Sequence, residues 1–564
     1  MFQDARELDD QTELEADVCI IGAGAAGTTL TTELARHGHK VLLIESGGLS
    51  YGSRVQSLYA GRLEGLLYEP LDLCRVRTFG GSTDARGWGG WCKPLADIDF
   101  EKRSWVPLSG WPIERRDLDD YYRRAYRTLS LPDNTELQAT RDAARDDVLQ
   151  FQSQYCKNEP CALSPAPELG KVSMDAIGQA QNVTALLHAN AIEIVTNEAA
   201  NHIEAVRIAT LDNKSHVARA RFIVLATGGI ENARLLLSSD RVQKEGLGNA
   251  SGFVGRCFME HPRYSWGRLS PEDLATRLPR YNPGTAVFAR KQGRSQTGTV
   301  NTPIFGASLA LTEKAQREFE LLGARTWIVP VSGTGDRDAG REFKELVFWL
   351  KKRRIPSDTI RRIKVALGDL PNAIGAVSAH LMAKVRPPTD WQFITVLEQE
   401  PNPSSRVRLD QDRDALGMRC AVLNWQIGDL TKRTLIKTRE LFARELQASG
   451  LECAVEANPN RPTNQNENEP RWVWHHMGTT RMSADEKEGV VDRDCKVHGV
   501  ANLFIGGSSV FPTVGNDMPT LTVVALAHRM ADHLNLQIRA ANQPADALAN
   551  GSARHNETAV SHPV

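Results

Sequence analysis

The chain has 564 residues, of which 41% are hydrophobic and 24% are charged, a composition typical of a globular protein with two to four structural units. Lys and Arg number 68 against 69 Asp and Glu, and this balance gives no reason to expect a nucleic-acid partner. The nine cysteines form no CxxC pair and no Cys/His cluster at metal-ligand spacing, so we expect no bound metal.

The N-terminus and the distribution of apolar residues bear on the cellular compartment. Residues 1–17 are rich in acidic side chains and have no apolar core, unlike a secretory signal. The sequence contains no window of about 18 apolar residues, so we expect no membrane span. The expected compartment is a reducing cytoplasm.

The first predicted elements form a strand, turn, helix and strand. Residues 17–21 are an apolar run, a glycine-rich turn follows at 22–27, and residues 28–37 have helical spacing. A second apolar run at 40–44 ends at Glu45. This order is typical of the unit that binds the pyrophosphate of a dinucleotide.

Each glycine of this turn has a physical purpose. Gly22 permits the tight turn, Gly24 lets the backbone approach a pyrophosphate, and Gly27 lets the helix pack closely on the strand. The helix N-terminus then meets the phosphate charge. Glu45 is placed to accept hydrogen bonds from ribose hydroxyls, which disfavours NADP. The predicted phosphate contacts are Gly22, Gly24, Ala25, Ala26 and Gly27.

Two later blocks repeat the pattern of a strand that ends in a glycine turn. The strand-like run at 221–226 is followed by Thr227, two glycines and a helix that includes 233–237. The run at 502–505 is followed by Gly506 and Gly507 and by a helix over about 519–533. We expect the three blocks to assemble into one sheet. The turn at Thr227 favours a flavin protein with two dinucleotide turns, and a purely structural turn is the alternative.

The middle of the chain has a different sequence pattern, in which strand-like segments with alternating apolar residues, such as 391–398 and 405–409, stand among amphipathic helices. We interpret it as a second domain that covers the flavin. The expected segments are an FAD-binding domain over 1–256 that includes a flavin-contact loop at 78–112, a substrate-binding domain over 257–457, a return to the FAD-binding domain over 458–540, and a disordered tail over 541–564.

Several sequence blocks resemble the glucose-methanol-choline (GMC) oxidoreductases, a family of FAD enzymes that oxidise alcohols and sugars. The blocks are residues 17–45, Phe79–Thr83 with Trp88–Cys92, Ser109–Pro112, Ala226–Leu235, His475–Thr479 and Asn502–Thr522. Gly229–Arg234, His475–Met482 and Glu398–Pro403 are similar to the bacterial branch near the pyranose and glycoside oxidases.

The resemblance implies a fold of class α/β plus α+β. It combines a Rossmann-like FAD-binding domain of the GMC type with a discontinuous substrate domain built on a β-sheet with helices. It also implies that Gly80, Gly81 and Ser82 approach the flavin ring and that Gly506 and Gly507 flank the cofactor. Several relatives carry a flavin-linking histidine where this chain has Gly87, so we expect FAD to be bound without a covalent bond.

The resemblance also implies a catalytic base. It is His475, the histidine that opens the HxMG block, and a neutral imidazole suits removal of a hydroxyl proton as hydride moves to flavin N5. The second family residue, His or Asn, normally precedes a Pro-Thr pair, where this chain has Met518. We predict Asn516 in that role, because a carboxylate such as Asp517 would repel a developing alkoxide. The alternatives are that His476 fills the role or that His475 acts alone.

The predicted activity is oxidation of a CH–OH group, a secondary hydroxyl of a sugar or glycoside by the resemblance. One alternative substrate is a non-sugar alcohol such as a polyol, an aminocyclitol or a choline-like compound. A second alternative is a flavin-binding protein without turnover. The electron acceptor is expected to be O₂, a quinone or a redox protein.

Overall fold

The computed structural model describes residues 1–86, 91–131, 148–163, 169–269, 281, 304–330, 343, 346–347, 350, 359–368, 391–451 and 470–542. Gly87, at the place of the flavin-linking histidine, lies outside the described residues. So does the expected disordered tail from residue 543 onward.

The larger sheet has eight strands, seven in the order β1-β7-β3-β2-β10-β9-β8, with β17 paired to β10. They are β1 (Phe2–Asp4), β2 (Glu13–Ile21), β3 (Val41–Ile44), β7 (Val183–Leu187), β8 (Asn190–Thr196), β9 (Ile203–Ala209), β10 (Ser215–Leu225) and β17 (Leu503–Ile505). Only the pairs β10–β9 and β9–β8 are antiparallel. Residues 18–21 and 41–44 are buried, as expected for parallel strands covered on both faces.

The three predicted glycine turns meet at one edge of this sheet. Ile21 aligns with Leu225 between β2 and β10, and Leu225 aligns with Ile505 between β10 and β17. The backbone N–H of Ala226 donates to the carbonyl of Ile21 at 2.8 Å, and that of Gly506 donates to the carbonyl of Leu225 at 2.7 Å. The prediction that the three blocks form one sheet is confirmed.

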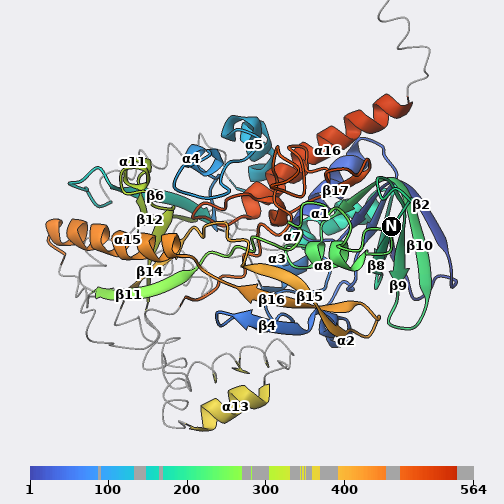
Figure 1. Cartoon of the computed structure of the whole chain (residues 1–564), viewed down its shortest axis with the longest axis horizontal. Coiled ribbons are helices and arrows are strands. Elements are labelled where there is room, and N and C mark those ends of the chain that lie inside the picture. Colours follow the sequence, from blue (N-terminus) through green and yellow to red (C-terminus); the bar gives the residue numbers. More distant parts are fainter. Residues whose placement is uncertain are drawn as a thin grey trace, which may run out of the picture.

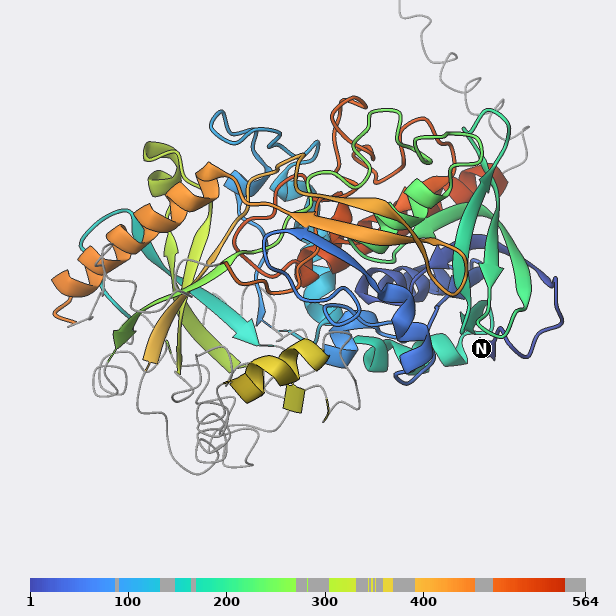
Figure 2. The same cartoon turned by 60° about the horizontal axis from the view of Figure 1, so that its bottom comes forward.

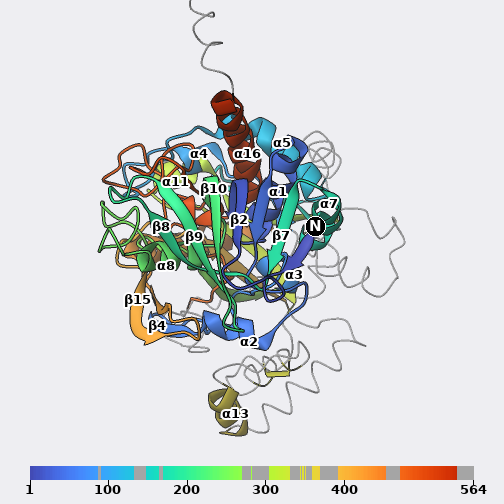
Figure 3. The same ribbon diagram turned by 90° about the vertical axis from the view of Figure 1, so that its right-hand side faces the viewer.

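Four helices pack around this sheet. They are α1 (Ala25–Arg36), α5 (Asp119–Thr128), α7 (Leu169–Gln179) and α16 (Thr520–Asn542). α1 lies against α16 and α7, and α5 lies against α16 (Figure 3). Leu30 and Leu34 of α1 are completely buried, because they lie four residues apart on the face that meets the core. α1 begins at Ala25, shortly after β2 ends at Ile21, so its N-terminus lies at the edge that carries the turns.

A second sheet lies at the opposite end of the molecule, together with the long helix α15 (Asp429–Ala448) (Figures 1 and 2). Its six strands are antiparallel in the order β11-β14-β13-β12-β6-β5. They are β5 (Trp91–Cys92), β6 (Cys156–Leu163), β11 (Arg263–Leu269), β12 (Ile304–Leu311), β13 (Ala324–Pro330) and β14 (Trp391–Leu397). β5 and β6 come from the segment predicted as the FAD-binding domain, so the chain enters this sheet before residue 257. The domain boundaries stay a prediction.

The remaining elements are short. A three-stranded sheet contains β15 (Arg406–Arg413), β16 (Arg419–Trp425) and β4 (Gly61–Gly65). The other helices are α2 (Ser53–Gln56), η1 (Ser57–Tyr59), α3 (Gly81–Arg86), α4 (Asp97–Phe100), η2 (Arg115–Leu118), α8 (Glu231–Ser238), α11 (Glu313–Glu318), α13 (Thr359–Gly368) and η5 (Ser508–Val510). Of the helices that the structure describes, none is long and apolar enough to cross a membrane.

Candidate active site

A cavity of about 450 Å³ opens at the carboxyl ends of β2, β3 and β10. Its volume is in the range of ligand sites, and open α/β sheets bind ligands at this edge. Of the predicted site residues, the cavity is lined by Gly22, Gly24, Ala25, Ala26, Glu45, Gly80, Gly81, Ser82, Thr227, Gly507 and His475. Gly27, Gly506 and Asn516 are not among the described residues that line it.

The geometry of the first glycine turn explains which glycines face the cavity. Gly22 has φ +104°, and a Cβ there would lie 2.6 Å from the carbonyl oxygen of Ala226. A Cβ on Gly27 would lie 1.8 Å from the carbonyl oxygen of Gly22, so Gly27 closes the turn. A Cβ on Gly24 would meet no atom within 4 Å. The N-terminus of α1 therefore presents backbone N–H groups to open space, which suits a phosphate.

Glu45 is the carboxylate at the end of β3. Its Oε2 accepts from the N–H of Ala23 at 2.9 Å and its Oε1 accepts from the N–H of Gly47 at 2.7 Å. Burial raises its pKa, and these hydrogen bonds oppose the rise. A carboxylate has about four acceptor positions, so Glu45 can also accept from a ribose hydroxyl. The residues present fit an adenine dinucleotide.

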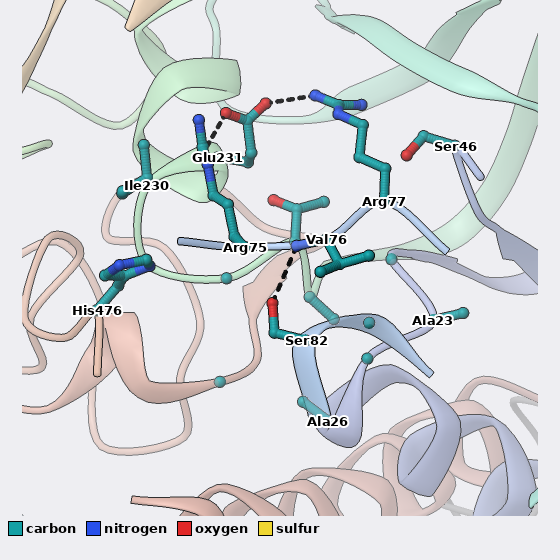
Figure 4. Close-up of a pocket in the computed structure, with 18 of the residues that line it drawn as sticks. Ala23, Ala26, Ser46, Arg75, Val76, Arg77, Ser82, Ile230, Glu231 and His476 are labelled. Atoms are coloured by element: carbon teal, nitrogen blue, oxygen red, sulfur yellow. Dashed lines mark hydrogen bonds and ion pairs between the residues drawn. The ribbon is translucent and has the colours of Figure 1, made fainter. Parts of the chain in front are cut away.

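A charged cluster on the cavity wall was missed by the sequence analysis. Glu231 binds Arg75 at 2.7 Å and Arg77 at 2.8 Å (Figure 4). It also contacts Arg234, which pairs with Asp414. Burial alone would raise the pKa of Glu231, but the guanidinium groups of Arg75, Arg234 and Arg77 hold it at about 2. Of this cluster, Arg75 and Arg77 are the cations that line the cavity, beside the carboxylates of Glu231 and Asp414. Arg75 and Glu231 are 156 positions apart, so no local spacing predicted their contact.

His475 lies in a polar cluster at the cavity. Its Nδ1 is 2.8 Å from Nδ1 of His261, and its backbone N–H donates to Glu260 at 2.9 Å. The other oxygen of Glu260 accepts from the hydroxyl of Tyr68 at 2.6 Å, and that hydroxyl lies 3.0 Å from Nε2 of His476. The sequence analysis singled out His475 and His476 but missed the other three residues, because these act through contacts that form only in the fold.

Burial sets the protonation of this cluster. It lowers the pKa of His475 well below 6.5, and the neighbouring imidazoles of His261 and His476 lower it further. Burial raises the pKa of Glu260 to about 7, against the opposing effect of its hydrogen bonds. His475 is therefore neutral at physiological pH, which is the protonation state that a general base needs.

Two family models match the chain. The sequence model of the GMC oxidoreductases matches residues 401–527, and that of the FAD dependent oxidoreductases matches residues 17–245. The chain therefore carries the C-terminal domain of the GMC oxidoreductases together with an FAD domain. It is a GMC-type, FAD-dependent oxidoreductase of alcohols or sugars.

Three relatives illustrate the range of this GMC oxidoreductase's similarities. The fructose dehydrogenase large subunit of Gluconobacter japonicus is 24% identical over 67% of this chain and 59% of that protein. The 2-methyl-1,2-propanediol dehydrogenase of Mycolicibacterium austroafricanum is 24% identical over 92% of this chain and 95% of that one. The paromamine 6'-oxidase of Streptomyces fradiae is 23% identical over 91% and 90%, respectively.

A solved structure has the same fold. It is a formate oxidase variant of Aspergillus oryzae, determined to study FAD modification. It covers 94% of this chain and 99% of its own, with a TM-score of 0.56 and 17% sequence identity. The likeness confirms the predicted GMC-type fold.

Asn516, the predicted second catalytic residue, is not among the described residues that line the cavity. Met518 lines the cavity, whereas Asn516 lies against Gly323, where an added Cβ would be 3.4 Å from the amide nitrogen of Asn516. Asp517 is buried in an ion pair with Arg325, so its carboxylate is already engaged. The catalytic role of Asn516 stays a prediction, and His476, which lines the cavity, stays the alternative.

Proposed function

We propose that this GMC oxidoreductase oxidises a secondary hydroxyl group of a sugar or glycoside, with His475 as the base that takes the hydroxyl proton. The observation that carries the proposal is the neutral, buried imidazole of His475 at the wall of the cofactor cavity. When bound, FAD supplies the acceptor for the hydride of the carbinol carbon. His475 supplies the complementary half of the reaction, since loss of the hydroxyl proton lets the carbonyl group form.

The chain's own residues divide the cavity into two functional ends. At one end, the N-terminus of α1 provides positive potential for the pyrophosphate, and Glu45 accepts from the ribose. At the other end, His475 provides a nitrogen atom for the substrate hydroxyl, and His476, whose Nε2 contacts Tyr68, also lines the cavity. We propose the following cofactor contacts: Gly22, Gly24, Ala25, Ala26, Glu45, Gly80, Gly81, Ser82, Thr227 and Gly507, with Gly27 and Gly506 supporting the turns.

The substrate class rests on the relatives. Two of them are named for fructose and for paromamine, which favours a carbohydrate. A third relative, matched over 92% of this chain, is named for 2-methyl-1,2-propanediol, and it favours a non-sugar alcohol instead. Anaerobic bleaching of the flavin absorption band by sugars, glycosides, polyols and aminocyclitols separates the two. Bleaching by the sugar panel is expected. Bleaching by the non-sugar alcohols alone would refute the sugar assignment, and no bleaching would indicate a protein without turnover.

Replacement of the base tests the mechanism directly. His475→Ala is expected to keep bound FAD, because the phosphate and ribose contacts are unchanged. Its rate of flavin bleaching by substrate should fall by about 10² or more. The visible spectrum of the purified variant checks the FAD content, and stopped-flow absorption measures the rate. A near-normal rate would contradict the assignment of His475 as base.

We also propose that FAD is bound without a covalent bond, because the resemblance places Gly87 where relatives carry a linking histidine. Acid precipitation is expected to release all of the yellow colour into the supernatant, and colour retained in the protein pellet would overturn this. The electron acceptor is O₂, a quinone or a redox protein. Turnover measured with each acceptor in turn distinguishes them.

A further inference from the structure

The contact between His475 and His261 is built by the pairing of two segments. The segments 259–263 and 471–477 run antiparallel and exchange backbone hydrogen bonds near both ends. Between these bonds, one carboxylate oxygen of Glu260 accepts the backbone N–H of both histidines, each at 2.9 Å. The two imidazole rings meet edge to face, with an angle of 89° between their planes. The fold therefore fixes both histidines relative to each other.

Backbone carbonyls determine which nitrogen of His261 carries a proton. Its Nε2 lies 3.0 Å from the carbonyl oxygen of Gly515 and 3.3 Å from that of Val514. Carbonyl oxygens only accept hydrogen bonds, so Nε2 of His261 must be protonated. In a neutral imidazole the other nitrogen is then an acceptor. Nδ1 of His261 therefore offers a lone pair toward His475.

The acceptor at His261 determines the tautomer of His475. A separation of 2.8 Å between the two Nδ1 atoms requires that one of them donates. Because Nδ1 of His261 is the acceptor, Nδ1 of His475 carries the proton. In neutral His475 the Nε2 atom is then unprotonated, and among the described residues it has no hydrogen-bond partner. It is the atom that can accept a proton from a substrate.

The charge state of His261 supports this assignment of the His475 tautomer. Burial lowers the pKa of His261, and its side chain is fully buried. The carboxylates of Asp517 and Glu398 oppose this effect, but each is itself paired, with Arg325 and Arg103, respectively. His261 is therefore neutral at physiological pH. If it were a cation, it would donate to His475 and impose the opposite tautomer.

We propose that His261 is a positioning residue that holds His475 in the tautomer protonated at Nδ1. The backbone carbonyls of residues 514 and 515 hold His261 in turn, because they accept from its Nε2. This inference rests on the proposed role of His475 as base. In the reaction, the O–H bond of the substrate breaks and a bond forms between that proton and Nε2 of His475. FAD, when bound, would supply the acceptor for the carbinol hydride and its electron pair. The resulting imidazolium keeps its hydrogen bond from Nδ1 to His261.

The first test observes the tautomer without any need for turnover. Nitrogen-15 NMR of the FAD-bound protein, labelled in its histidine rings, distinguishes protonated from unprotonated ring nitrogens. The signals of His475 are identified by their loss in His475→Ala. At pH 8 we expect a protonated Nδ1 and an unprotonated Nε2. A protonated Nε2 would overturn the proposal, even if His475→Ala confirmed the base.

The second test uses two replacements of His261. His261→Leu removes the acceptor, and we expect it to slow substrate-driven flavin bleaching by at least about tenfold with little change in the substrate concentration that gives half-saturation. His261→Asn places an amide oxygen near the position of Nδ1, and it should restore much of the rate. Equal rates in the two variants, or a wild-type rate in His261→Leu, would overturn the proposal.

A matched control separates the positioning role of His261 from the general loss of a buried histidine. His216 is also buried, and its Nε2 lies 2.9 Å from the carbonyl oxygen of Ala5, away from the cavity. His216→Leu therefore removes a comparable hydrogen bond and should leave the bleaching rate unchanged. If His475→Ala itself bleached at a near-normal rate, the proposed function would fail, whereas the tautomer measured by NMR would still stand or fall on its own.

Discussion

Replacing Gly22 by alanine is expected to damage the protein before any cofactor binds. Gly22 has φ +104°, a backbone conformation that costs an alanine about 1–2 kcal/mol. The added Cβ would also lie 2.6 Å from the carbonyl oxygen of Ala226, and this backbone cannot move cheaply because the N–H of Ala226 donates to the carbonyl of Ile21 in the neighbouring strand. We expect Gly22→Ala to lose about 2–4 kcal/mol in total. Because a chain of this length has an unfolding entropy of roughly 1.2 kcal/mol/K, the FAD-free protein should then melt about 2–3 °C lower.

Gly24→Ala is the matched control in the same turn. Gly24 has φ −79° and an added Cβ would meet no atom within 4 Å, so the FAD-free protein should lose less than about 1 kcal/mol. Because Gly24 lines the cavity, its new methyl group occupies the space of the cofactor. We expect Gly24→Ala to melt normally without FAD but to bind FAD weakly. Scanning calorimetry and flavin titration measure the two effects. Equal melting temperatures of the two FAD-free variants would refute the assignment of separate roles.

Two further predictions concern buried carboxylates. Glu398→Gln removes the charge that pairs with the fully buried Arg103, so the free energy of unfolding should fall by about 3 kcal/mol. A urea midpoint equal to that of the wild type would contradict this. The double variant Arg103→Met with Glu398→Leu should lose less unfolding free energy than Glu398→Gln, because it leaves no unpaired buried charge. Burial raises the pKa of Glu260 from 4.5 to about 7, so its stabilising contribution is complete below about pH 4.5 and is lost as pH rises through 7. Relative to Glu260→Gln, the wild type should therefore lose up to about 3 kcal/mol of unfolding free energy between pH 4.5 and 7. Melting curves of both proteins across this pH range measure the difference, and the opposite trend would exclude the raised pKa.

The parallel sheet was predictable because its signals are local. Each strand that ends in a glycine turn is a run of buried apolar residues, and the glycines that follow permit the turn or the close approach of backbone. The spacing within 17–45 thus predicted β2, α1 and β3 to within a few residues. The strands predicted at 391–398 and 405–409 are confirmed as β14 and β15, because the alternation of their side chains is also a local pattern. The participation of β5 and β6 in the second sheet was missed, because neither strand ends in a glycine turn that would link it to distant strands of its sheet.

The active-site residues divide in the same way. His475 stands in a motif that resembles a family pattern, so the sequence alone singled it out. Its partner His261 stands 214 positions earlier, and nothing around it in the sequence distinguishes it from a buried structural histidine. The cluster around Glu231 likewise joins residues that are distant in the chain. Residues that act through other residues are recognised only when the fold brings them into contact.

Met518 stands where the family pattern has His or Asn, and this difference changes the demands on the proposed base. The family pattern places a second polar residue where the thioether of Met518 lines the cavity, and a thioether is a poor hydrogen-bond donor or acceptor. Unless Asn516 or His476 compensates, the charge that develops on the substrate oxygen must be met by His475 alone. In that case Nε2 of His475 has to be unprotonated before the substrate binds. The hydrogen bonds that His261 makes with the carbonyl of Gly515 and with His475 fix this protonation state, so in our proposal His475 can take the hydroxyl proton without a second histidine.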